Sequence, residues 1–189
     1  MASETSAQAV PSQHADIAEH YDALGNHVLE RKRNPFMRSR TGGRILSALM
    51  LPYFTALPPR GFGVLTTTGR RTGKTRRKCV HAIRRGDEAY IVMIRPKLTA
   101  GPAAWLLNIR ADPRVRLRLR GGTYNGVVRE LAEGPERERA GRAYCEAVSP
   151  FDYVECSFHR AGLPTRSKVI ELHRSWFETG IPLVVELNV

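Results

Sequence analysis

The sequence has few of the residues that build metal centres and disulfide frameworks. Its three cysteines, Cys79, Cys145 and Cys156, form no C-x-x-C pair and are odd in number. Its six histidines are scattered, with no H-E-x-x-H or comparable spacing. Zinc sites and disulfide-stapled domains need regularly spaced ligands or paired thiols. The sequence therefore predicts no metal site and a reducing, cytoplasmic location.

Long apolar segments are also missing. The first twenty residues carry early acids and no apolar core, so we expect no secretory signal peptide there. The most apolar run, residues 45–57, is interrupted by Pro52 and is shorter than the about 20 residues that cross a bilayer. Arginines 38, 40 and 44 precede it. Three interpretations stay open: a helix facing the core, a cover over a pocket, or a peripheral contact with a membrane surface.

Acidic residues are scarce relative to basic ones. The chain has 30 Lys and Arg against 18 Asp and Glu, which gives a formal charge of +12. Residues 61–120 alone hold 15 of these basic residues and 3 of the acids, so the surplus lies there. Such a surplus suits nucleic acid, acidic lipid or a phosphorylated cofactor. Nucleic acid is disfavoured because the basic residues are not interleaved with aromatics and no helix-turn-helix pattern occurs.

The segment TTTGRRTGKTRR, residues 66–77, lacks the spacing of a nucleotide-binding P-loop. Gly69 and Gly73 enclose three residues, whereas that motif needs four before its Gly-Lys. A strand pattern, residues 78–84, follows in place of a helix. We therefore predict a cationic turn between two strands. Its amides and guanidinium groups form either an anion site or a solvated hairpin tip.

Apolar periodicity predicts the remaining elements. The clearest strand is RVRLRLR, residues 114–120, with three apolar residues on one face and four arginines on a face that is either the wet side of a sheet or a binding surface. The other predicted strands are residues 62–68, 78–84, 88–95, 123–130 and 181–187. The predicted helices are residues 16–33, 44–50, 102–109, 135–148 and 168–178.

This order of elements predicts an α+β fold. Mostly antiparallel strands would form a small barrel, with N-terminal, inserted and C-terminal helices. A Rossmann domain is disfavoured because the chain has neither βαβ alternation nor G-x-G-x-x-G. We expect a disordered N-terminus over residues 1–14, a helical segment over residues 15–60 and a barrel domain over residues 61–189.

Three stretches in order carry a resemblance to a known family. They are LTTTGRRTGKTRR (residues 65–77), AAWLLNIRADPRV (residues 103–115) and IPLVVE (residues 181–186). Together they resemble the deazaflavin-dependent nitroreductases, actinobacterial split β-barrel oxidoreductases that use coenzyme F420. That coenzyme carries a phosphate and a tail of glutamates, so the resemblance implies a polyanionic partner for the basic surplus.

The resemblance also implies which residues bind the coenzyme. Arginine suits the phosphate and tail because its planar fork pairs with oxyanions. The turn and the next strand would hold these groups through Arg70, Arg71, Thr72, Arg76, Arg77 and Lys78. The deazaflavin ring would be lined by Cys79, Val80, His81, Met93, Ile94 and Arg95. A short helix would close over the cofactor through Ala104, Trp105, Leu107 and Asn108.

The implied reaction is transfer of a hydride to an electron-poor small molecule, namely an activated alkene, a quinone or a nitro compound. Negative charge then develops on the acceptor and needs a hydrogen bond or a proton. His81 and Tyr153 are the candidate catalytic residues, with solvent as a third proton source. The sequence departs from the family at Ile94-Arg95, where a Ser-Lys pair is common, and at His81, where tyrosine is usual. The alternative is a split-barrel protein that binds FMN, haem or a lipid.

Overall fold

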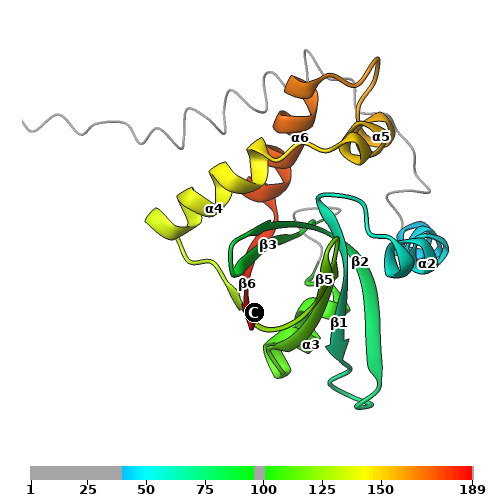
Figure 1. The fold of residues 1–189 in the computed structure, drawn as a ribbon, viewed down its shortest axis with the longest axis vertical. Helices are drawn as coiled ribbons and strands as arrows, with labels where there is room; N and C mark the ends of the chain where they lie inside the picture. Colours follow the sequence, from blue (N-terminus) through cyan, green and yellow to red (C-terminus); the bar gives the residue numbers. More distant parts are fainter. Residues whose placement is uncertain (1–39, 96–100, 189) are drawn as a thin grey trace, which may run out of the picture.

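The computed structural model of the chain describes residues 40–95 and 101–188. Six strands form one closed barrel in the order β1-β2-β3-β6-β5-β4 (Figure 1). Every neighbouring pair is antiparallel. The α+β split-barrel fold predicted from the sequence is confirmed. The strands are β1 (Phe62–Thr68), β2 (Thr75–Arg85), β3 (Glu88–Met93), β4 (Arg114–Leu119), β5 (Gly122–Glu130) and β6 (Ile181–Asn188).

Helices precede, interrupt and follow the strands, as expected. Helix α5 was not predicted, and α2 is longer than expected because it continues through Pro52. Strand β2 begins at Thr75, three residues before its predicted start at Lys78. The predicted disorder of residues 1–14 and helix of residues 16–33 lie outside the described residues. The helices are α2 (Arg40–Ala56), α3 (Ala104–Ala111), α4 (Pro135–Glu146), α5 (Pro150–His159) and α6 (Arg166–Thr179).

The barrel core follows from period-two patterns in the strands. On β4, Val115, Leu117 and Leu119 are all buried, while the arginines between them face outward. The same cluster includes Leu65 of the paired strand β1 and Leu183 of β6, both at most 1% exposed. This interior cluster closes the barrel, because side chains from all of its walls meet at the axis.

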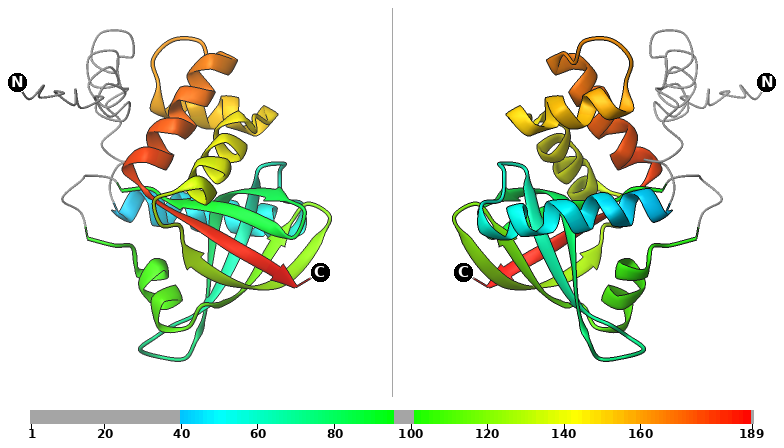
Figure 2. Two further views of the ribbon diagram at one scale, coloured as in Figure 1. Left: turned by 90° about the vertical axis from the view of Figure 1, so that its left-hand side faces the viewer. Right: turned by 90° about the vertical axis from the view of Figure 1, so that its right-hand side faces the viewer.

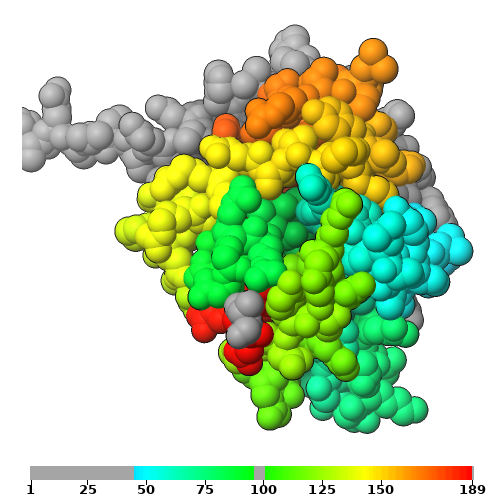
Figure 3. Space-filling view, in the orientation of Figure 1, coloured from blue at the N-terminus to red at the C-terminus, as the bar shows by residue number. Residues whose placement is uncertain are grey.

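Three helices pack on the outer face of the barrel wall, against β2, β3 and β6. Both views in Figure 2 place α4, α5 and α6 together on one side of the molecule, while α3 and the tip of the β1–β2 hairpin lie on the opposite side. A second apolar cluster, built around Tyr144, Val169 and Trp176, fills the space between these helices and the barrel. In the space-filling view the helices, yellow to orange, close directly onto the green strands (Figure 3). The molecule therefore has one helix-covered end and one hairpin end.

Helix α2 packs on the outside of β1 and β2. Phe54 is 3% exposed and contacts the rings of Phe62 and Phe151 edge-on, at centroid distances of 5.7 and 5.5 Å. The opposite face carries an exposed apolar stripe at helical spacing: Ile45, Leu49, Tyr53 and Leu57, each between 45 and 67% exposed. The run of residues 45–57 is thus a helix with one face in the core and one in solvent. No described helix combines the length and apolarity that a membrane crossing requires.

Gly63 of β1 is required by close backbone packing. A Cβ at this position would lie 2.6 Å from the Arg118 carbonyl oxygen of β4 and 2.7 Å from Leu119 Cδ2. We therefore expect Gly63→Ala to lower the free energy of unfolding by roughly 2–3 kcal/mol, because neither the strand nor the packed leucine can move away cheaply. Chemical denaturation measures this change. Gly101→Ala is the control, since a Cβ there meets nothing within 4 Å; equal stability of the two variants would contradict the interpretation.

Candidate functional site

The cationic turn joins β1 to β2 at the hairpin end of the barrel. The Gly69 N–H donates to the Lys74 carbonyl at 2.9 Å, and the Gly73 N–H donates to the Gly69 carbonyl at 2.7 Å. Gly73 has φ +64°, a conformation that favours glycine. The side chains of the tip are exposed, as are Arg76 and Arg77 at the start of β2. The P-loop interpretation is therefore excluded, because a second strand follows the turn.

Asn108 of α3 ties the turn to the barrel. Its Oδ1 accepts the backbone N–H of Arg70 at 3.2 Å, and its Nδ2 donates to Thr67 Oγ1 at 3.4 Å. Asn108 is 6% exposed, and Thr67 is 4% exposed. Two predicted binding residues that are 38 positions apart, Arg70 and Asn108, are thus in direct contact. The contact fixes the base of the turn while its guanidinium groups extend into solvent.

An apolar group of predicted ring-lining residues meets beside this turn. Val80 and Met93 are buried in the barrel interior, and Trp105 of α3 packs partly buried against the same cluster. Ile94 is 41% exposed, and Arg95 borders a small pocket of about 230 Å³. Of the remaining helix residues, Leu107 is half-buried and Ala104 is exposed. The structure thus places the turn, the end of β3 and α3 at the hairpin end.

Lys78 and Cys79 lie where β2 enters the barrel wall. Burial lowers the pKa of Lys78, although the neighbouring Cys79 partly opposes this effect. The Cys79 thiol donates to the Ser47 carbonyl of α2 at 3.8 Å, and burial raises its pKa. Because strand side chains alternate, Cys79 faces α2 while Val80 faces the barrel interior. These two residues therefore line opposite faces of the strand.

His81 continues the outward face of β2 and points into the helical layer. Its Nε2 lies 3.1 Å from Asp152 Oδ1 on α5, and His173 Nε2 of α6 lies 3.6 Å from the same oxygen. Asp152 Oδ2 accepts the Ser149 N–H. The His81 side chain is 4% exposed and that of Asp152 is fully buried. Three elements distant in sequence therefore meet at one carboxylate, and their ligand atoms lie within 4.8 Å of one another.

Burial and hydrogen bonding set the charges in this cluster. Burial alone would raise the pKa of Asp152, but His173, His81 and the Ser149 N–H outweigh it and hold this pKa well below its usual range. Burial lowers the pKa of His81, and the bond to Asp152 only partly offsets this. A neutral imidazole that donates its Nε2–H to a carboxylate satisfies both groups. Hydrogen bonds to Asp152 therefore explain the close approach of these side chains without a metal ion.

Two further titratable groups surround the cluster. Burial raises the pKa of Tyr144 well above its ordinary value, and its hydroxyl has no hydrogen-bond partner among the described residues. Burial, together with the charge of Asp152, raises the pKa of Glu155 to about 8. Tyr153, the second predicted catalytic residue, follows Asp152 on α5. Its side chain is partly buried against the apolar cluster of the helices. Asp152, His173 and Tyr144 were not predicted, although Ser149 three positions before Asp152 is a helix-capping signal in the sequence.

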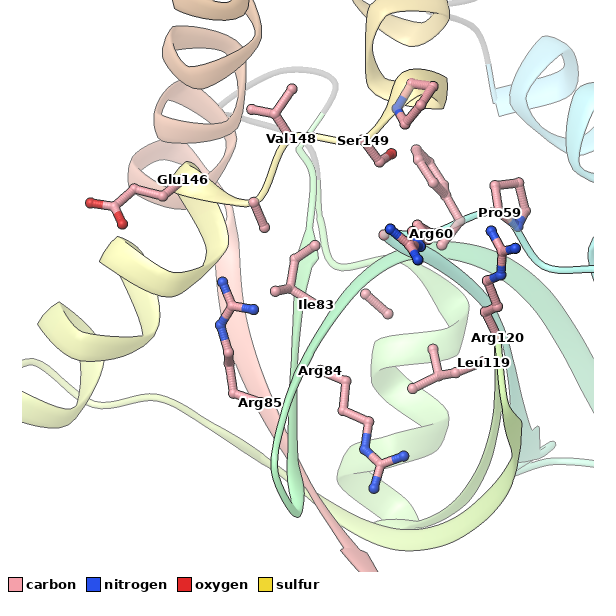
Figure 4. A pocket seen from close by; sticks show the side chains of 15 residues that line it. Pro59, Arg60, Ile83, Arg84, Arg85, Leu119, Arg120, Glu146, Val148 and Ser149 are labelled. Carbon is pink, nitrogen blue, oxygen red and sulfur yellow. The ribbon is translucent and has the colours of Figure 1, made fainter.

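A pocket of about 470 Å³ opens at the helix-covered end, between the start of β1, the ends of β2 and β4, and the segment joining α4 to α5 (Figure 4). None of the predicted binding residues lines it. His81 lies behind it, since a Cβ at Gly61 would be 3.6 Å from His81 Nε2. Its polar lining comprises Arg60, Arg84, Arg85, Arg120, Glu146 and Ser149.

Comparison with known proteins identifies the family. Residues 39–160 match the family described as F420H(2)-dependent quinone reductase. The chain belongs to this family. The match spans the cationic turn, α3 and the helix that carries Asp152. It confirms an F420-dependent reductase of the kind that the sequence motifs resemble, and it favours coenzyme F420 over the FMN, haem and lipid alternatives.

Solved structures similar to this chain share the fold at low identity. A protein described as a domain-swapped dimer is 21% identical, covers 76% of this chain and 92% of its own, and has a TM-score of 0.48. An F420-H2 dependent reductase is 23% identical, covers 67% of this chain and 95% of its own, and has a TM-score of 0.46. A FAD-binding protein from Mesorhizobium loti is 15% identical, covers 76% and 91%, and has a TM-score of 0.41. No curated protein matches the chain.

The positive charge at the hairpin end is complementary to the negative charge of the coenzyme that this family uses. Arg70, Arg71, Arg76 and Arg77 are exposed, and none forms an ion pair with a described residue. Unpaired guanidinium groups above a rigid turn suit a ligand with a phosphate and carboxylates. The role of each residue in binding F420 stays a prediction.

Glu155 should make stability depend on pH in a defined direction. Its pKa is about 8 in the folded protein against 4.5 ordinarily, so the unfolded chain releases a proton first as pH rises. The folded state therefore loses stability between pH 4.5 and 8. We expect Glu155→Gln to be more stable than the wild type at pH 8 by on the order of 2 kcal/mol, and equal to it near pH 4.5. Denaturation at the two pH values measures this.

Glu178→Gln, on the exposed side of α6, provides the control for this measurement. It removes a carboxylate without touching the buried cluster, so its effect should be the same at both pH values. If the stability of Glu155→Gln relative to the wild type is the same at pH 4.5 and pH 8, as expected for the control, the raised pKa of Glu155 is contradicted.

Proposed function

We propose that this protein transfers a hydride from reduced coenzyme F420 to a quinone. The single observation that carries the proposal is the family match over residues 39–160, because it covers the turn and α3, which the charge pattern selects independently. Bound F420 supplies the hydride, and the quinone becomes a hydroquinone after gaining a proton. Activated alkenes and nitro compounds are the competing acceptors.

The chain's own contribution to this chemistry is binding and orientation. Arg71 and Arg76 would grip the phosphate and tail, while the Asn108 contact to Arg70 keeps the turn from moving. A fixed turn matters because hydride transfer requires the reacting atoms to be held close and aligned. Val80, Met93 and Trp105 would supply an apolar wall that excludes water from the ring.

Proton supply to the reduced quinone involves the helical layer in this proposal. His81 Nε2 is engaged by Asp152, and His81 Nδ1 has no partner among the described residues. A proton role for His81 would therefore use Nδ1. Tyr153 is the second candidate, and solvent is the third. Comparing His81→Asn and Tyr153→Phe in kcat distinguishes the three sources, because solvent supply leaves both variants as active as the wild type.

The function is tested by anaerobic oxidation of reduced F420 with menadione, cyclohexenone and a nitroaromatic compound. We expect kcat/KM for menadione to exceed that for the other two acceptors by at least about tenfold, the factor that a difference of 1.4 kcal/mol in transition-state binding produces. The absorbance of oxidised F420 reports the rate. A preference for cyclohexenone or the nitro compound would overturn the quinone assignment, and no oxidation with any acceptor would overturn the reductase itself in this chain.

The coenzyme contact is tested by neutralising the turn. We expect Arg71→Gln combined with Arg76→Gln to raise the Kd for F420 by at least about tenfold, because each charge-assisted bond to an oxyanion contributes roughly 1.5–3 kcal/mol. The loss should shrink at high salt, where the remaining attraction is screened. Fluorescence titration measures it. Arg142→Gln, an exposed arginine on α4, is the control with one cation removed elsewhere. A double variant whose Kd for F420 rises no more than that of the control would contradict the contact.

We further propose that the exposed stripe on α2 docks the protein on an anionic membrane, where a lipid-soluble quinone resides. Its four apolar side chains would insert at the interface while the +12 charge attracts the lipid headgroups. We expect Leu49→Glu with Leu57→Glu to reduce co-sedimentation with phosphatidylglycerol vesicles at least about tenfold, because burying apolar area provides the binding energy. Leu163→Glu is the control, because Leu163 lies in the segment between α5 and α6 and is 83% exposed. Unchanged sedimentation of the double variant would contradict the proposal.

A further inference from the structure

The arginine-lined pocket at the helix-covered end is separate from the predicted coenzyme site. It begins at Arg60 and Phe62, where β1 starts, whereas the cationic turn follows Thr68, where β1 ends. Seven extended residues span about 20 Å. Figure 2 shows these two ends of the barrel on opposite sides of the molecule. The pocket therefore needs its own explanation.

Positive charge dominates the pocket rim. Arg60, Arg85 and Arg120 are exposed, and their guanidinium groups form no ion pair or hydrogen bond with any described residue. Arg120 follows β4, and the pairing of Val64 with Arg118 brings it beside the start of β1, next to Arg60. Cations gathered without a counter-ion repel one another, so a bound anion would relieve them.

The other charged groups of the lining do not neutralise this rim. Arg84 already has partners. Its Nε donates to the Gly86 carbonyl at 2.8 Å, and its guanidinium lies 4.2 Å from the centre of the Tyr124 ring. Glu146 is the one acid among the lining residues. In Figure 4 its carboxylate points away from Arg60 and Arg120, on the far side of the pocket.

The floor of the pocket is apolar, with one buried hydroxyl group. Phe62, Ile83 and Leu119 are each at most 5% exposed and form its base. Ser149, 8% exposed, lies at its edge, and no described residue accepts its hydroxyl hydrogen. A buried donor without an acceptor costs free energy that a ligand oxygen would recover. The pocket thus combines a flat apolar surface, an unused donor and unpaired guanidinium groups.

We propose that this pocket binds an amphiphilic organic oxyanion, a molecule with an apolar ring or chain and one carboxylate or phosphate. Arg60 and Arg120 bind the oxyanion, Ser149 donates to it, and the apolar body lies on Phe62 and Leu119. The volume of about 470 Å³ is in the range that holds a small organic ligand. Guanidinium groups recognise both oxyanions through paired hydrogen bonds. The site does not depend on hydride transfer or on F420.

The test uses the full chain without coenzyme. Isothermal titration compares 2-naphthoate with 2-naphthamide, which has the same shape and no charge. We expect naphthoate to bind at least about tenfold more tightly, consistent with one charge-assisted contact. Naphthyl phosphate is the second arm and shows whether carboxylate or phosphate is preferred. Equal affinity for naphthoate and naphthamide, or no binding of either anion at about 1 mM, overturns the proposal.

Variants locate the binding. Arg60→Gln with Arg120→Gln should raise the Kd for naphthoate at least tenfold and leave that for naphthamide unchanged, while Val148→Trp, which fills the pocket, should abolish binding of both. Arg71→Gln with Arg76→Gln is the matched control, because it removes two cations at the hairpin end. Loss of naphthoate binding in this control and not in the pocket variants would assign the anion to the turn and overturn the proposal. F420 binding by the pocket variants reports that they are folded.

Discussion

The carboxylate of Asp152 is the interaction on which the arrangement of this protein depends. It accepts the Ser149 N–H at the start of α5 and faces histidines from β2 and α6, so it connects the barrel wall to two helices of the covering layer. Burying a carboxylate is costly unless it is fully hydrogen-bonded. Here both of its oxygens are engaged, and the low pKa of Asp152 reports that the surroundings stabilise its charged form. The helical layer is therefore held in one position on the barrel, and with it the segment that forms one wall of the arginine-lined pocket.

Barrel closure separates two chemically distinct ends. Antiparallel pairing around the whole circle leaves no free edge, so loops at the rims are the places where ligands can contact backbone and side chains. The hairpin end presents a cationic turn braced by Asn108, and the helix-covered end presents arginines over an apolar floor. The basic surplus of residues 61–120 is thus divided between two rims that the linear sequence places in one block.

Sequence patterns predicted the strands and the turn, whose conformation depends mainly on residues close together in the chain. The alternation of β4 predicts both a strand and its buried face, and the glycines at Gly69 and Gly73 predict a turn, since each depends on neighbours in sequence. The resemblance predicted the coenzyme, which the family match confirms, and a set of contact residues, which stays a prediction. Contacts such as Arg70 with Asn108 could be expected only through that resemblance, because the two residues are 38 positions apart.

The helical layer could not be predicted in the same way. Helix α5 has 10 residues, fewer than an isolated helix needs to be stable, so its capping signal at Ser149 and Asp152 gave too little to define a helix. His81 was predicted beside the coenzyme ring, yet its environment is decided by Asp152, which lies 71 positions later. Strand alternation alone does predict that Cys79 and His81 share one face of β2 and Val80 the other. Only the packing of α2, α5 and α6 on that face determines what His81 contacts.

Coenzyme F420 carries the redox chemistry itself, and the composition of the hairpin end suits the coenzyme site predicted there. A hydride donor that is already reactive needs no metal and no buried nucleophile from the protein. In the proposed binding mode it needs to be held in one place, by several cations on a turn whose backbone position is determined before binding. The Asn108 contacts do this at the backbone, because they fix the base of the turn and leave the guanidinium groups free to adjust. In the proposed binding mode, rigidity at the backbone with freedom at the side-chain tips would let the cations follow the charged tail while the ring keeps a single position.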